Sequence, residues 1–417
     1  MSFITPPEGL PSCPVRVDIL TKEYPPNIYG GAGVHVAELV KALRATGTQT
    51  KVRAFGEPVG EADTDGFPDL PQLAEANGAL KTLGVDLTMV PATQGADIVH
   101  SHTWYANFAG HLALMLHGVP HVVTAHSLEP MRPWKAEQLG GGYALSSFIE
   151  RTAYEGAAAV IAVSDGMRRD VLRSYPQLDE SKVHVVHNGI DADAWAPDHS
   201  EKALEIVRGH GVDTGRPSIV FVGRITRQKG LPFLLRAMRD VPTDVQLVLC
   251  AGAPDTPEIL AEVEGLIAEL RESRDGVVWI PDMLPRHEVV ALLSQATCFV
   301  CPSVYEPLGI VNLEAMACEA AVVGTATGGI PEVVVDGETG WLVPIEQVND
   351  GTGTPVDPDT FVADLARALT EATSDVEEAR RRGRAGRQRA VEHFGWDAIA
   401  ERTQQVYATV LEGSRTA

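Results

Sequence analysis

Two glutamates, Glu306 and Glu314, lie eight positions apart where an apolar run gives way to a helical pattern. The apolar run closes with the turn residues of Val300–Ser303, and Leu313–Cys318 has the pattern of a helix. We therefore expect Glu306 on a loop and Glu314 on the following helix, with both carboxylates facing one crevice. Taken alone the spacing is a weak signal, since two glutamates eight positions apart recur by chance in any acidic helical protein.

A basic pair, Arg224 and Lys229, lies in a segment that follows another strand-like run. The segment therefore leaves the carboxyl end of a strand, where open α/β sheets bind their ligands. An arginine fork can hold paired oxygens and a lysine adds a point charge, so together they can neutralise a departing nucleoside diphosphate without a metal ion. The alternative is a surface loop with ordinary charges.

A glycine-rich segment, Gly30–Gly33, separates the first strand-like run from an amphipathic helix. Glycines there let backbone N–H groups approach an anion at the helix N-terminus, where the helix dipole favours negative charge. The dinucleotide fingerprint of dehydrogenases fits less well, because Val36 replaces its third glycine and the approach Tyr24–Tyr29 is too long for a tight turn. A contact to phosphate or sugar and a simple packing turn both stay open.

Two patterns are compatible with metal binding. His100 and His102 alternate on a strand and share a face, as two zinc ligands would, but no third ligand stands at a telling spacing. Asp191 and Asp193 form an Asp-x-Asp pattern, which can hold a divalent cation. This pattern continues the turn-like segment His187–Ile190, and we favour the turn. We therefore expect no metal site.

Short β-branched runs alternate with helical stretches along the whole chain, which predicts a parallel α/β architecture. The pattern restarts after a turn-rich segment at 190–216, which we expect to link two sheets. A length of 417 residues agrees with two domains, because single cores stop growing near roughly 250–300 residues. The expected strands are Val15–Leu20, Thr50–Phe55, Asp97–His100, His121–Thr124, Ala159–Val163 and Lys182–His187, then Ser218–Gly223, Gln246–Ala251, Val277–Ile280, Cys298–Cys301 and Ala321–Gly324.

Composition limits the partners. An apolar fraction of 44% with 22% charged residues is ordinary for a soluble globular protein, and no window reaches the ~20 apolar residues of a membrane span. The segment Met1–Pro14 lacks the features of a secretory signal, so the cytoplasm is the default location. The net charge of −22 argues against nucleic acid and anionic membranes as partners. The oligomeric state is not readable, and a homodimer is left open.

Three further patterns have ordinary structural interpretations. The five cysteines give no disulfide framework, and positions 298 and 301 of a strand point to opposite faces, so we expect buried structural thiols there. The arginine-rich stretch 380–389 is expected to be a solvated helix face rather than a phosphate site. Thr327–Glu332 makes a glycine turn that opens a helix, and it is either a cap or a contact to sugar hydroxyls.

Together these segments resemble glycosyltransferase family 4 over almost the whole chain. The spacing of Glu306 and Glu314 is similar to the Glu-x7-Glu signature of retaining glycosyltransferases that use nucleotide-sugar donors, and Ser303–Gly309 strengthens the match. The resemblance implies an α/β protein of the GT-B fold, with two Rossmann-like domains facing a cleft. It implies an acceptor domain at 1–195, a donor domain at 196–395, and a crossover helix at 396–417 that packs on the first domain.

Within that family the chain is similar to the actinobacterial glycogen synthase and α-maltose-1-phosphate synthase branch. The likeness lies in Thr21–Val36, His100–Tyr105 and Cys301–Asn312. One departure is that Ile28 stands where bacterial glycogen synthases carry the lysine of a Lys-x-Gly-Gly loop. This departure argues against a role limited to polymer synthesis.

The resemblance also implies roles for individual residues. Arg224 and Lys229 would stabilise the leaving diphosphate, Glu306 would act by electrostatics and sugar positioning, and His126 would hydrogen-bond the transferred sugar. Glu314 would accept hydrogen bonds from the ribose hydroxyls. The remaining donor-binding residues would be Gly30, Gly31, Gly309, Ile310 and Val311, and the acceptor-binding residues His102, Trp104, Tyr105 and Asn188.

The implied reaction is glucosyl transfer from ADP-glucose to an α-1,4-glucan end or to glucose 1-phosphate, with no cofactor and no metal. Three alternatives stay open: a mannosyltransferase that uses GDP-mannose, a sugar-nucleotide epimerase on the same two-domain plan, and a binder of sugar nucleotides without catalysis. The motifs do not fix the base of the donor or the acceptor.

Overall fold

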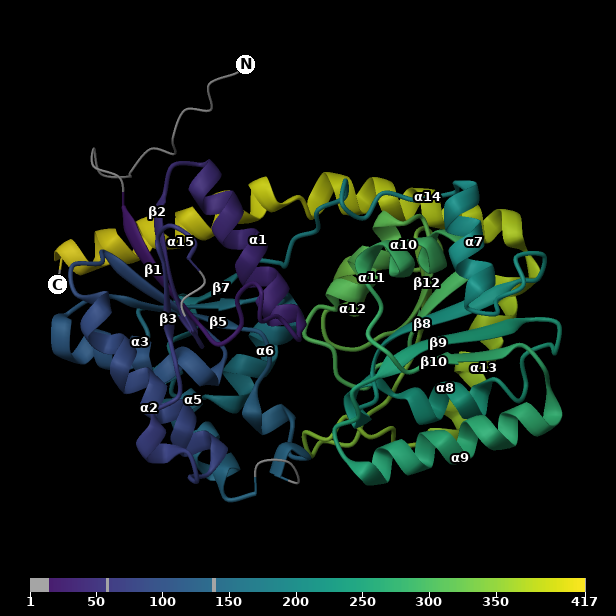
Figure 1. Cartoon of the computed structure of the whole chain (residues 1–417), viewed down its shortest axis with the longest axis horizontal. Helices are drawn as coiled ribbons and strands as arrows, with labels where there is room; N and C mark the ends of the chain where they lie inside the picture. Colours follow the sequence, from purple (N-terminus) through teal and green to yellow (C-terminus); the bar gives the residue numbers. More distant parts are fainter. Residues whose placement is uncertain (1–14, 58–59, 137–139, 417) are drawn as a thin grey trace, which may run out of the picture. The chain divides into compact units, whose positions relative to one another are not determined.

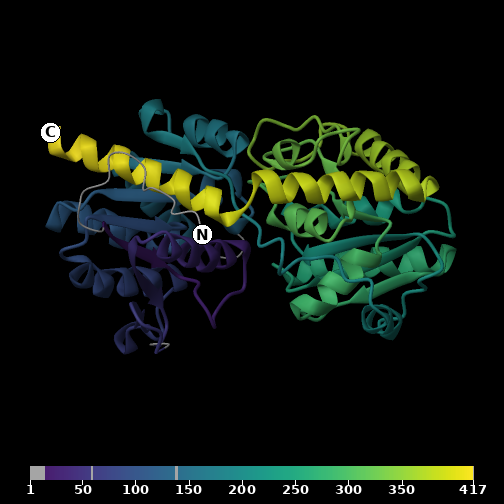
Figure 2. The ribbon, with the colours of Figure 1, turned by 90° about the horizontal axis from the view of Figure 1, so that it is seen from above.

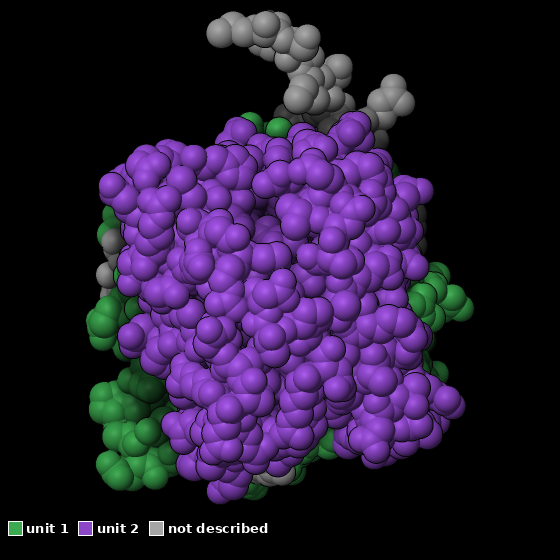
Figure 3. Space-filling model, turned by 90° about the vertical axis from the view of Figure 1, so that its right-hand side faces the viewer, with its two compact units in different colours: residues 1–189, 396–417 green, residues 190–395 purple. Residues whose placement is uncertain are grey.

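The computed structural model describes residues 15–57, 60–136 and 140–416 (Figure 1). The chain forms two compact units, which Figure 3 shows in different colours. The first consists of Met1–Gly189 with Trp396–Ala417, and the second of Ile190–Gly395. We expected the division after residue 195; it falls after Gly189, at the start of the turn that contains Asp191. Each unit is an α/β structure around one parallel sheet, which confirms the predicted fold class.

The first unit is built on a seven-stranded sheet with the strand order β3-β2-β1-β4-β5-β6-β7. All neighbouring strands are parallel, as the alternation of β-branched runs with helices predicts. The strands are β1 (Arg16–Thr21), β2 (Gln49–Phe55), β3 (Thr64–Phe67), β4 (Ile98–His102), β5 (His121–Ala125), β6 (Ala159–Ala162) and β7 (Val183–Val185).

Helices cover both faces of this sheet. They are α1 (Gly31–Ala45), α2 (Gly78–Met89), α3 (Trp104–His117), α5 (Gly142–Gly156), α6 (Asp165–Ser174) and the closing α15 (Trp396–Thr416). Successive residues of β1 enter different cores, because strand side chains alternate: Ile19 packs with α1 and α15, and Leu20 packs with α2 and α3. Figure 1 shows these two helix layers on opposite sides of the sheet.

The helix α15 belongs to the first unit although it comes last in the chain. It runs beside α1 (Figures 1 and 2), and its buried Ile399 and Tyr407 join the core of that face. At the outer end of α1, the Gln404 amide donates to the hydroxyls of Thr46 and Thr48 at 2.8 and 2.7 Å. The last helix therefore completes a core that the first 189 residues leave open on one face.

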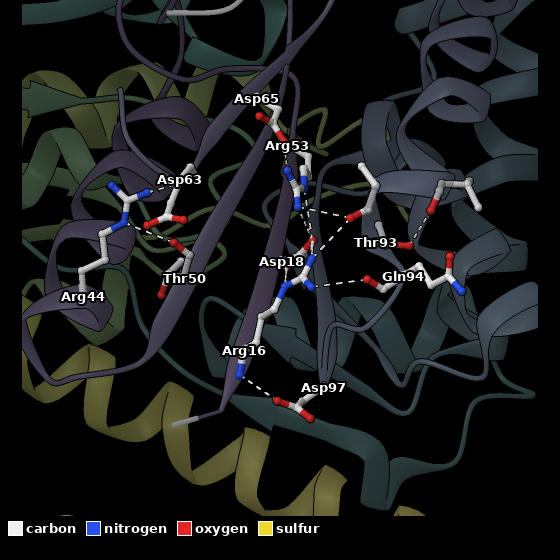
Figure 4. A network of polar contacts seen from close by, with 12 residues as sticks. Arg16, Asp18, Arg44, Thr50, Arg53, Asp63, Asp65, Thr93, Gln94 and Asp97 are labelled. Atoms are coloured by element: carbon white, nitrogen blue, oxygen red, sulfur yellow. Dashed lines mark hydrogen bonds and ion pairs between the residues drawn. The ribbon is translucent and has the colours of Figure 1, made fainter. Parts of the chain in front are cut away.

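A buried ion network holds the first strands together (Figure 4). The carboxylate of Asp18 is fully buried on β1, and it accepts hydrogen bonds from Arg53 of β2 at 3.0 and 3.1 Å and from Arg16 at 2.9 Å. Arg53 also pairs with Asp65 of β3. Because two guanidinium groups satisfy the Asp18 oxygens, the buried charge is compensated, and removing either arginine would leave it partly unpaired.

The second unit is built on a six-stranded parallel sheet with the order β10-β9-β8-β11-β12-β13. Its strands are β8 (Ser218–Arg224), β9 (Gln246–Gly252), β10 (Val277–Ile280), β11 (Cys298–Cys301), β12 (Ala321–Thr325) and β13 (Gly340–Val343). Its helices are α7 (Glu201–Gly209), α8 (Leu231–Ala237), α9 (Pro257–Ser273), α10 (Arg286–Gln295), α11 (Ile310–Ala317), α12 (Ile330–Val333), α13 (Pro358–Ser374) and α14 (Val376–His393). One large hydrophobic cluster joins the strands to α8, α9 and α13, while α11 packs against α14.

The cysteines and arginines of the second unit have structural roles. Cys250, Cys298, Cys301 and Cys318 are buried free thiols, as the strand pattern predicts for two of them, whereas Cys13 lies outside the described residues. The arginine run of α14 is only partly solvated. Its Arg382 is buried, donates to the Gly340 carbonyl at 2.8 Å and stacks on Trp341 at 3.8 Å. The expectation of a solvated face was therefore wrong for this residue.

Within the described residues, no helix combines the length and apolar character needed to span a bilayer.

Candidate functional site

Each sheet has one point where the strand order reverses, and the predicted site residues follow it. In the first unit β1 lies between β2 and β4, and in the second β8 lies between β9 and β11. Connections leave such neighbouring strands in opposite directions, which opens a crevice at their carboxyl ends. The glycine segment follows β1, and His102 is the last residue of β4. The loops after β8 and β11 carry Lys229 and Glu306.

The central contact of the second unit joins Lys229 to Glu306. The ammonium Nζ of Lys229 donates to Oε2 of Glu306 at 2.7 Å, and the Ser303 hydroxyl donates to the same oxygen at 2.9 Å. Burial disfavours the charged lysine, but the Glu306 carboxylate more than offsets this effect, so the pKa of Lys229 is raised above its ordinary value. The lysine therefore stays a cation at neutral pH. Its ammonium group is oriented by the Glu306 carboxylate, which the Ser303 hydroxyl holds in place.

Close backbone packing fixes the two loops of this contact. Gly230 has φ 65°, and a Cβ there would lie 2.0 Å from the Pro302 carbonyl oxygen, so only glycine lets the β8 loop approach the β11 loop. The Val304 amide donates to the Gln228 carbonyl at 2.9 Å. From the other side, the Gly329 amide donates to the Glu306 carbonyl at 2.9 Å. The turn at Thr327–Glu332 thus fixes the backbone of Glu306.

Arg224 lies at the end of β8, near Lys229 but in a different pairing. Its guanidinium is about half exposed and forms an ion pair with Asp255, so the structure does not join it to Glu306. An exposed guanidinium with one carboxylate partner keeps most of its five N–H donors for other acceptors. Arg224 can therefore bind an anion without breaking a buried contact.

Glu314 projects from α11 as expected, one turn after the start of the helix. Burial raises the pKa of its carboxyl to about 7, although the charges of Lys229 and Arg286 act in the opposite direction. The helix begins after Gly309, whose φ of 89° suits glycine and whose Cβ would meet the Asn312 amide at 2.3 Å. Ile310 and Val311 fill the first turn, where amide N–H groups have no partner within the helix.

In the first unit, the glycine segment binds a carboxylate of the protein itself, that of Glu23. The Glu23 carboxylate accepts hydrogen bonds from the amides of Tyr29 and Gly30 at 3.0 and 2.8 Å. Gly31 opens α1, and its amide has no acceptor among the described residues. The Gly30 amide is thus engaged by a side chain that the sequence pattern did not reveal, and the contact to phosphate or sugar stays a prediction.

Four histidines gather at the carboxyl edge of the first sheet. His102 Nδ1 lies 3.0 Å from His126 Nε2, and His35 of α1 packs edge-on against His126 with ring centroids 4.7 Å apart. His100 lies behind them and is held at both nitrogens, by Tyr407 at 2.7 Å and Thr124 at 2.6 Å. Burial lowers the pKa of all four rings, that of His35 to about 4, so the cluster is neutral at ordinary pH.

The predicted acceptor residues are mostly buried, and only Tyr105 is partly exposed. Trp104 is 3% exposed and packs with Ala79 and Ile149, so its side chain stabilises the core. Tyr105 stacks on Trp104 at 4.3 Å and carries the Lys22 ammonium over its ring at 3.8 Å. Asn188 is buried beside His35, with no partner for its side-chain oxygen among the described residues.

The turn between His102 and Trp104 is strained. Thr103 has φ 64° and ψ 159°, a region that a β-branched residue rarely enters. Strain of this kind persists where the surrounding structure determines the backbone, and it clusters at functional sites. It therefore supports a functional assignment for the loop after β4.

The site residues thus fall into two groups, one in each unit. The second unit brings together Lys229, Glu306 and Glu314, with Arg224 nearby in a separate ion pair. The first brings together His102 and His126 and adds three residues that the motifs did not predict: Lys22, Glu23 and His35. Asp191 accepts the Ala194 amide at 3.0 Å, which supports the turn over a metal site.

Comparison with known families gives two matches. Residues 29–194 match the family model described as Glycosyltransferase Family 4, and residues 203–389 match Glycosyl transferases group 1. The α-maltose-1-phosphate synthase of Mycolicibacterium smegmatis is 54% identical over 396 residues, covering 95% of this chain and 100% of that protein. The glycogen synthase of Mycobacterium tuberculosis is 28% identical over 439 residues, with 96% of each chain covered.

Solved structures show the same fold at low identity. Sucrose-phosphate synthase from Thermosynechococcus elongatus is similar with a TM-score of 0.74 at 24% identity, covering 96% of this chain and all of that one. The catalytic domain of starch synthase IV from Arabidopsis thaliana, bound to ADP and acarbose, also has a TM-score of 0.74, at 18% identity and the same coverage.

Proposed function

This chain belongs to glycosyltransferase family 4, and we propose that it transfers glucose from ADP-glucose, with retention of the anomeric configuration, to glucose 1-phosphate or to the end of an α-1,4-glucan. The observation that carries the proposal is the 54% identity to an α-maltose-1-phosphate synthase over nearly the full length of both chains. The identity to a glycogen synthase is 28%, so we rank glucose 1-phosphate before the glucan as acceptor.

The reaction breaks the bond between the anomeric carbon and the β-phosphate oxygen of the donor, and it forms a bond from that carbon to the acceptor 4-oxygen. The 4-hydroxyl proton passes to a donor phosphate oxygen, and ADP leaves with the bonding pair. Charge therefore grows on the diphosphate. We assign its stabilisation to Lys229 and Arg224, since preorganised cations reduce the cost of such charge.

The contact between Lys229 and Glu306 supports this assignment. A lysine that is held at 2.7 Å by a buried carboxylate has little freedom to turn away, so it needs little reorganisation when the diphosphate departs. Glu306 has the complementary roles of orienting the lysine and positioning the sugar. It is already shared between Lys229 and Ser303, which fits an electrostatic role better than that of a covalent nucleophile.

The other roles follow the same reasoning. We assign the ribose hydroxyls to Glu314, the phosphate oxygens to the amides of Gly30, Gly31, Gly309, Ile310 and Val311, and the transferred sugar to His126. His102, Tyr105 and Asn188 are assigned to the acceptor. Trp104 contributes by supporting Tyr105, because its own side chain is buried.

The proposal includes no cofactor and no metal requirement, and it places the protein in the cytoplasm. The substrates are ADP-glucose with glucose 1-phosphate or an α-glucan. Neither nucleic acid nor a membrane is a proposed partner, and a homodimer stays open. Membership of a glycosyltransferase family favours transfer over the epimerase alternative.

An assay of ADP release tests the proposal. The full chain is incubated with ADP-glucose alone, with glucose 1-phosphate and with glycogen, and the products are separated by chromatography. We expect fast ADP release with glucose 1-phosphate and a phosphorylated disaccharide as product. If neither acceptor stimulates ADP release while GDP-mannose is consumed, the mannosyltransferase alternative replaces our assignment.

A further inference from the structure

Three histidines from separate elements of the first unit meet in one place. His35 comes from α1, His102 ends β4, and His126 follows β5. One ring nitrogen from each lies within 4.8 Å of the other two nitrogens. No other group of three potential metal ligands is this compact in residues 15–57, 60–136 and 140–416. The fold therefore brings together three potential ligands, a set that the spacing of His100 and His102 did not predict.

Within the part of the chain that the structure describes, three nitrogens of this set have no partner, whereas His102 Nδ1 and His126 Nε2 contact only each other, so an ion bound between them would replace that one contact. Both ring nitrogens of His35 and Nε2 of His102 are buried and have no partner at hydrogen-bonding geometry among the described residues, although Asn188 lies beside His35. A buried polar atom without a partner costs roughly 1–3 kcal/mol, so native structures rarely keep several together without a reason. His100 is excluded, because Tyr407 and Thr124 engage both its nitrogens.

The chemistry of the three side chains selects a class of ion. Imidazole suits zinc, copper, nickel and iron, whereas calcium and magnesium prefer oxygen ligands. Three histidines with a fourth open position are a known arrangement for zinc, in which the nitrogens lie about 3.4 Å apart at Zn–N distances near 2.05 Å. His102 and His126 already bring two nitrogens to 3.0 Å. The third nitrogen, from His35, lies within 4.8 Å of the other two, so the rings would have to draw closer around an ion.

We propose that His35, His102 and His126 bind one divalent transition-metal ion of the zinc class, and that this ion inhibits the enzyme by competing with the donor sugar for His126. The binding half stands on the geometry of the three rings. The inhibition half rests on the proposed function, in which His126 contacts the sugar. The ion is not a cofactor in this proposal, since the leaving group is stabilised by Lys229 and Arg224 in the second unit.

Metal titration of the full chain tests the binding half. The protein is first freed of metal with a chelator and then titrated with Zn²⁺ by calorimetry, and Co²⁺ serves as a coloured probe of nitrogen coordination. We expect one ion per chain. His35→Gln should weaken binding by at least the roughly 10–100-fold that loss of a mere supporting residue costs. His117→Gln is the matched control, because this exposed histidine at the end of α3 lies outside the cluster, and it should bind as the unsubstituted chain does.

Absence of saturable Zn²⁺ binding, or equal affinity in the His35→Gln variant, overturns the proposal. Circular dichroism checks that the variant is folded, and His102→Gln serves as a second variant with the same expected loss. For the inhibition half, Zn²⁺ should raise the KM for ADP-glucose and leave kcat unchanged. Binding without this effect overturns the inhibition. Binding in a chain that releases no ADP even without metal upholds the site and overturns the proposed function instead, so the two failures are distinguishable.

Discussion

The hydroxyl of Tyr407 on the last helix lies 2.7 Å from Nδ1 of His100 on β4, although 307 positions separate the two residues in the chain. His100 in turn packs against His102 with ring centroids 4.3 Å apart. The last helix therefore contacts His102, one of the histidines assigned to substrate binding, indirectly through the buried ring of His100.

Replacing Tyr407 by Phe should remove this support. The His100 nitrogen would lose its partner while buried, which costs about 1–3 kcal/mol. We expect a lower midpoint of urea unfolding and a higher KM for the acceptor. Thr409→Ala on the exposed face of α15 is the control. An unchanged midpoint in the Tyr407 variant would show that the hydrogen bond contributes nothing.

Replacing Lys229 by Ala should lower kcat by roughly 10²–10³, the usual cost of one transition-state charge contact. Initial rates of ADP release at saturating ADP-glucose measure the effect. Lys202→Ala, an exposed lysine of α7 in the same unit, should retain full activity. Near-normal turnover without Lys229 would refute its assigned role.

Donor binding should strengthen as the pH rises through about 7, the pKa to which burial raises Glu314. The sign follows from the proposed role: ribose hydroxyls donate to the carboxylate, and the ionised fraction of Glu314 grows with pH. The KM for ADP-glucose, measured from pH 6 to 8, should therefore fall in the unsubstituted chain. In Glu314→Gln the KM should be higher and nearly constant over this range. If the KM of the Glu314→Gln variant fell with pH as steeply as that of the unsubstituted chain, another group would be responsible for the pH dependence.

The turn before α11 should not tolerate a side chain at Gly309. Its φ of 89° strains any other residue, and an added Cβ would lie only 2.3 Å from the Asn312 amide, so steric conflict adds to backbone strain. Gly211→Ala is a matched control, since its φ of 83° is equally strained but nothing lies within 4 Å of the added Cβ. We expect both variants to be destabilised by more than about 1 kcal/mol. Only Gly309→Ala should also lose activity, which urea unfolding and the ADP assay would show separately.

Chelation should not reduce activity. Because fixed cations are proposed to stabilise the diphosphate, EDTA should leave ADP release unchanged, or raise it where adventitious zinc is present. A steep loss that magnesium restores would instead indicate a metal requirement, for which Asp191 and Asp193 would be the first candidates.

Most of the two sheets could be predicted from the sequence, because buried parallel strands appear as continuous β-branched runs between helices. The missed strands are β3 (Thr64–Phe67) and β13 (Gly340–Val343). Each lies at the edge of its sheet, has four residues and contains a glycine. Short edge strands carry little periodic pattern, so their pairing is decided by neighbours distant in sequence.

Site residues could be predicted where they belong to a contiguous sequence motif. They could not be predicted where the fold brings together residues from distant segments. Glu306 and Lys229 stand in recognisable segments, although their 2.7 Å contact joins positions 77 residues apart. His35 lies on a helix face that spacing alone marks only as amphipathic. It meets His102 and His126 because α1 and the ends of β4 and β5 converge at one edge of the sheet. Such meetings depend on topology, which single-residue patterns do not encode.

The Glu23 carboxylate on the Gly30 amide gives the resting protein a tethered surrogate for phosphate. In the proposed function a phosphate oxygen competes with this carboxylate for the Gly30 N–H, because the amide has a single donor hydrogen. A ligand that is also held by its sugar or base should therefore displace the carboxylate more easily than a small free anion does. We expect the loop to favour a whole sugar nucleotide over free phosphate.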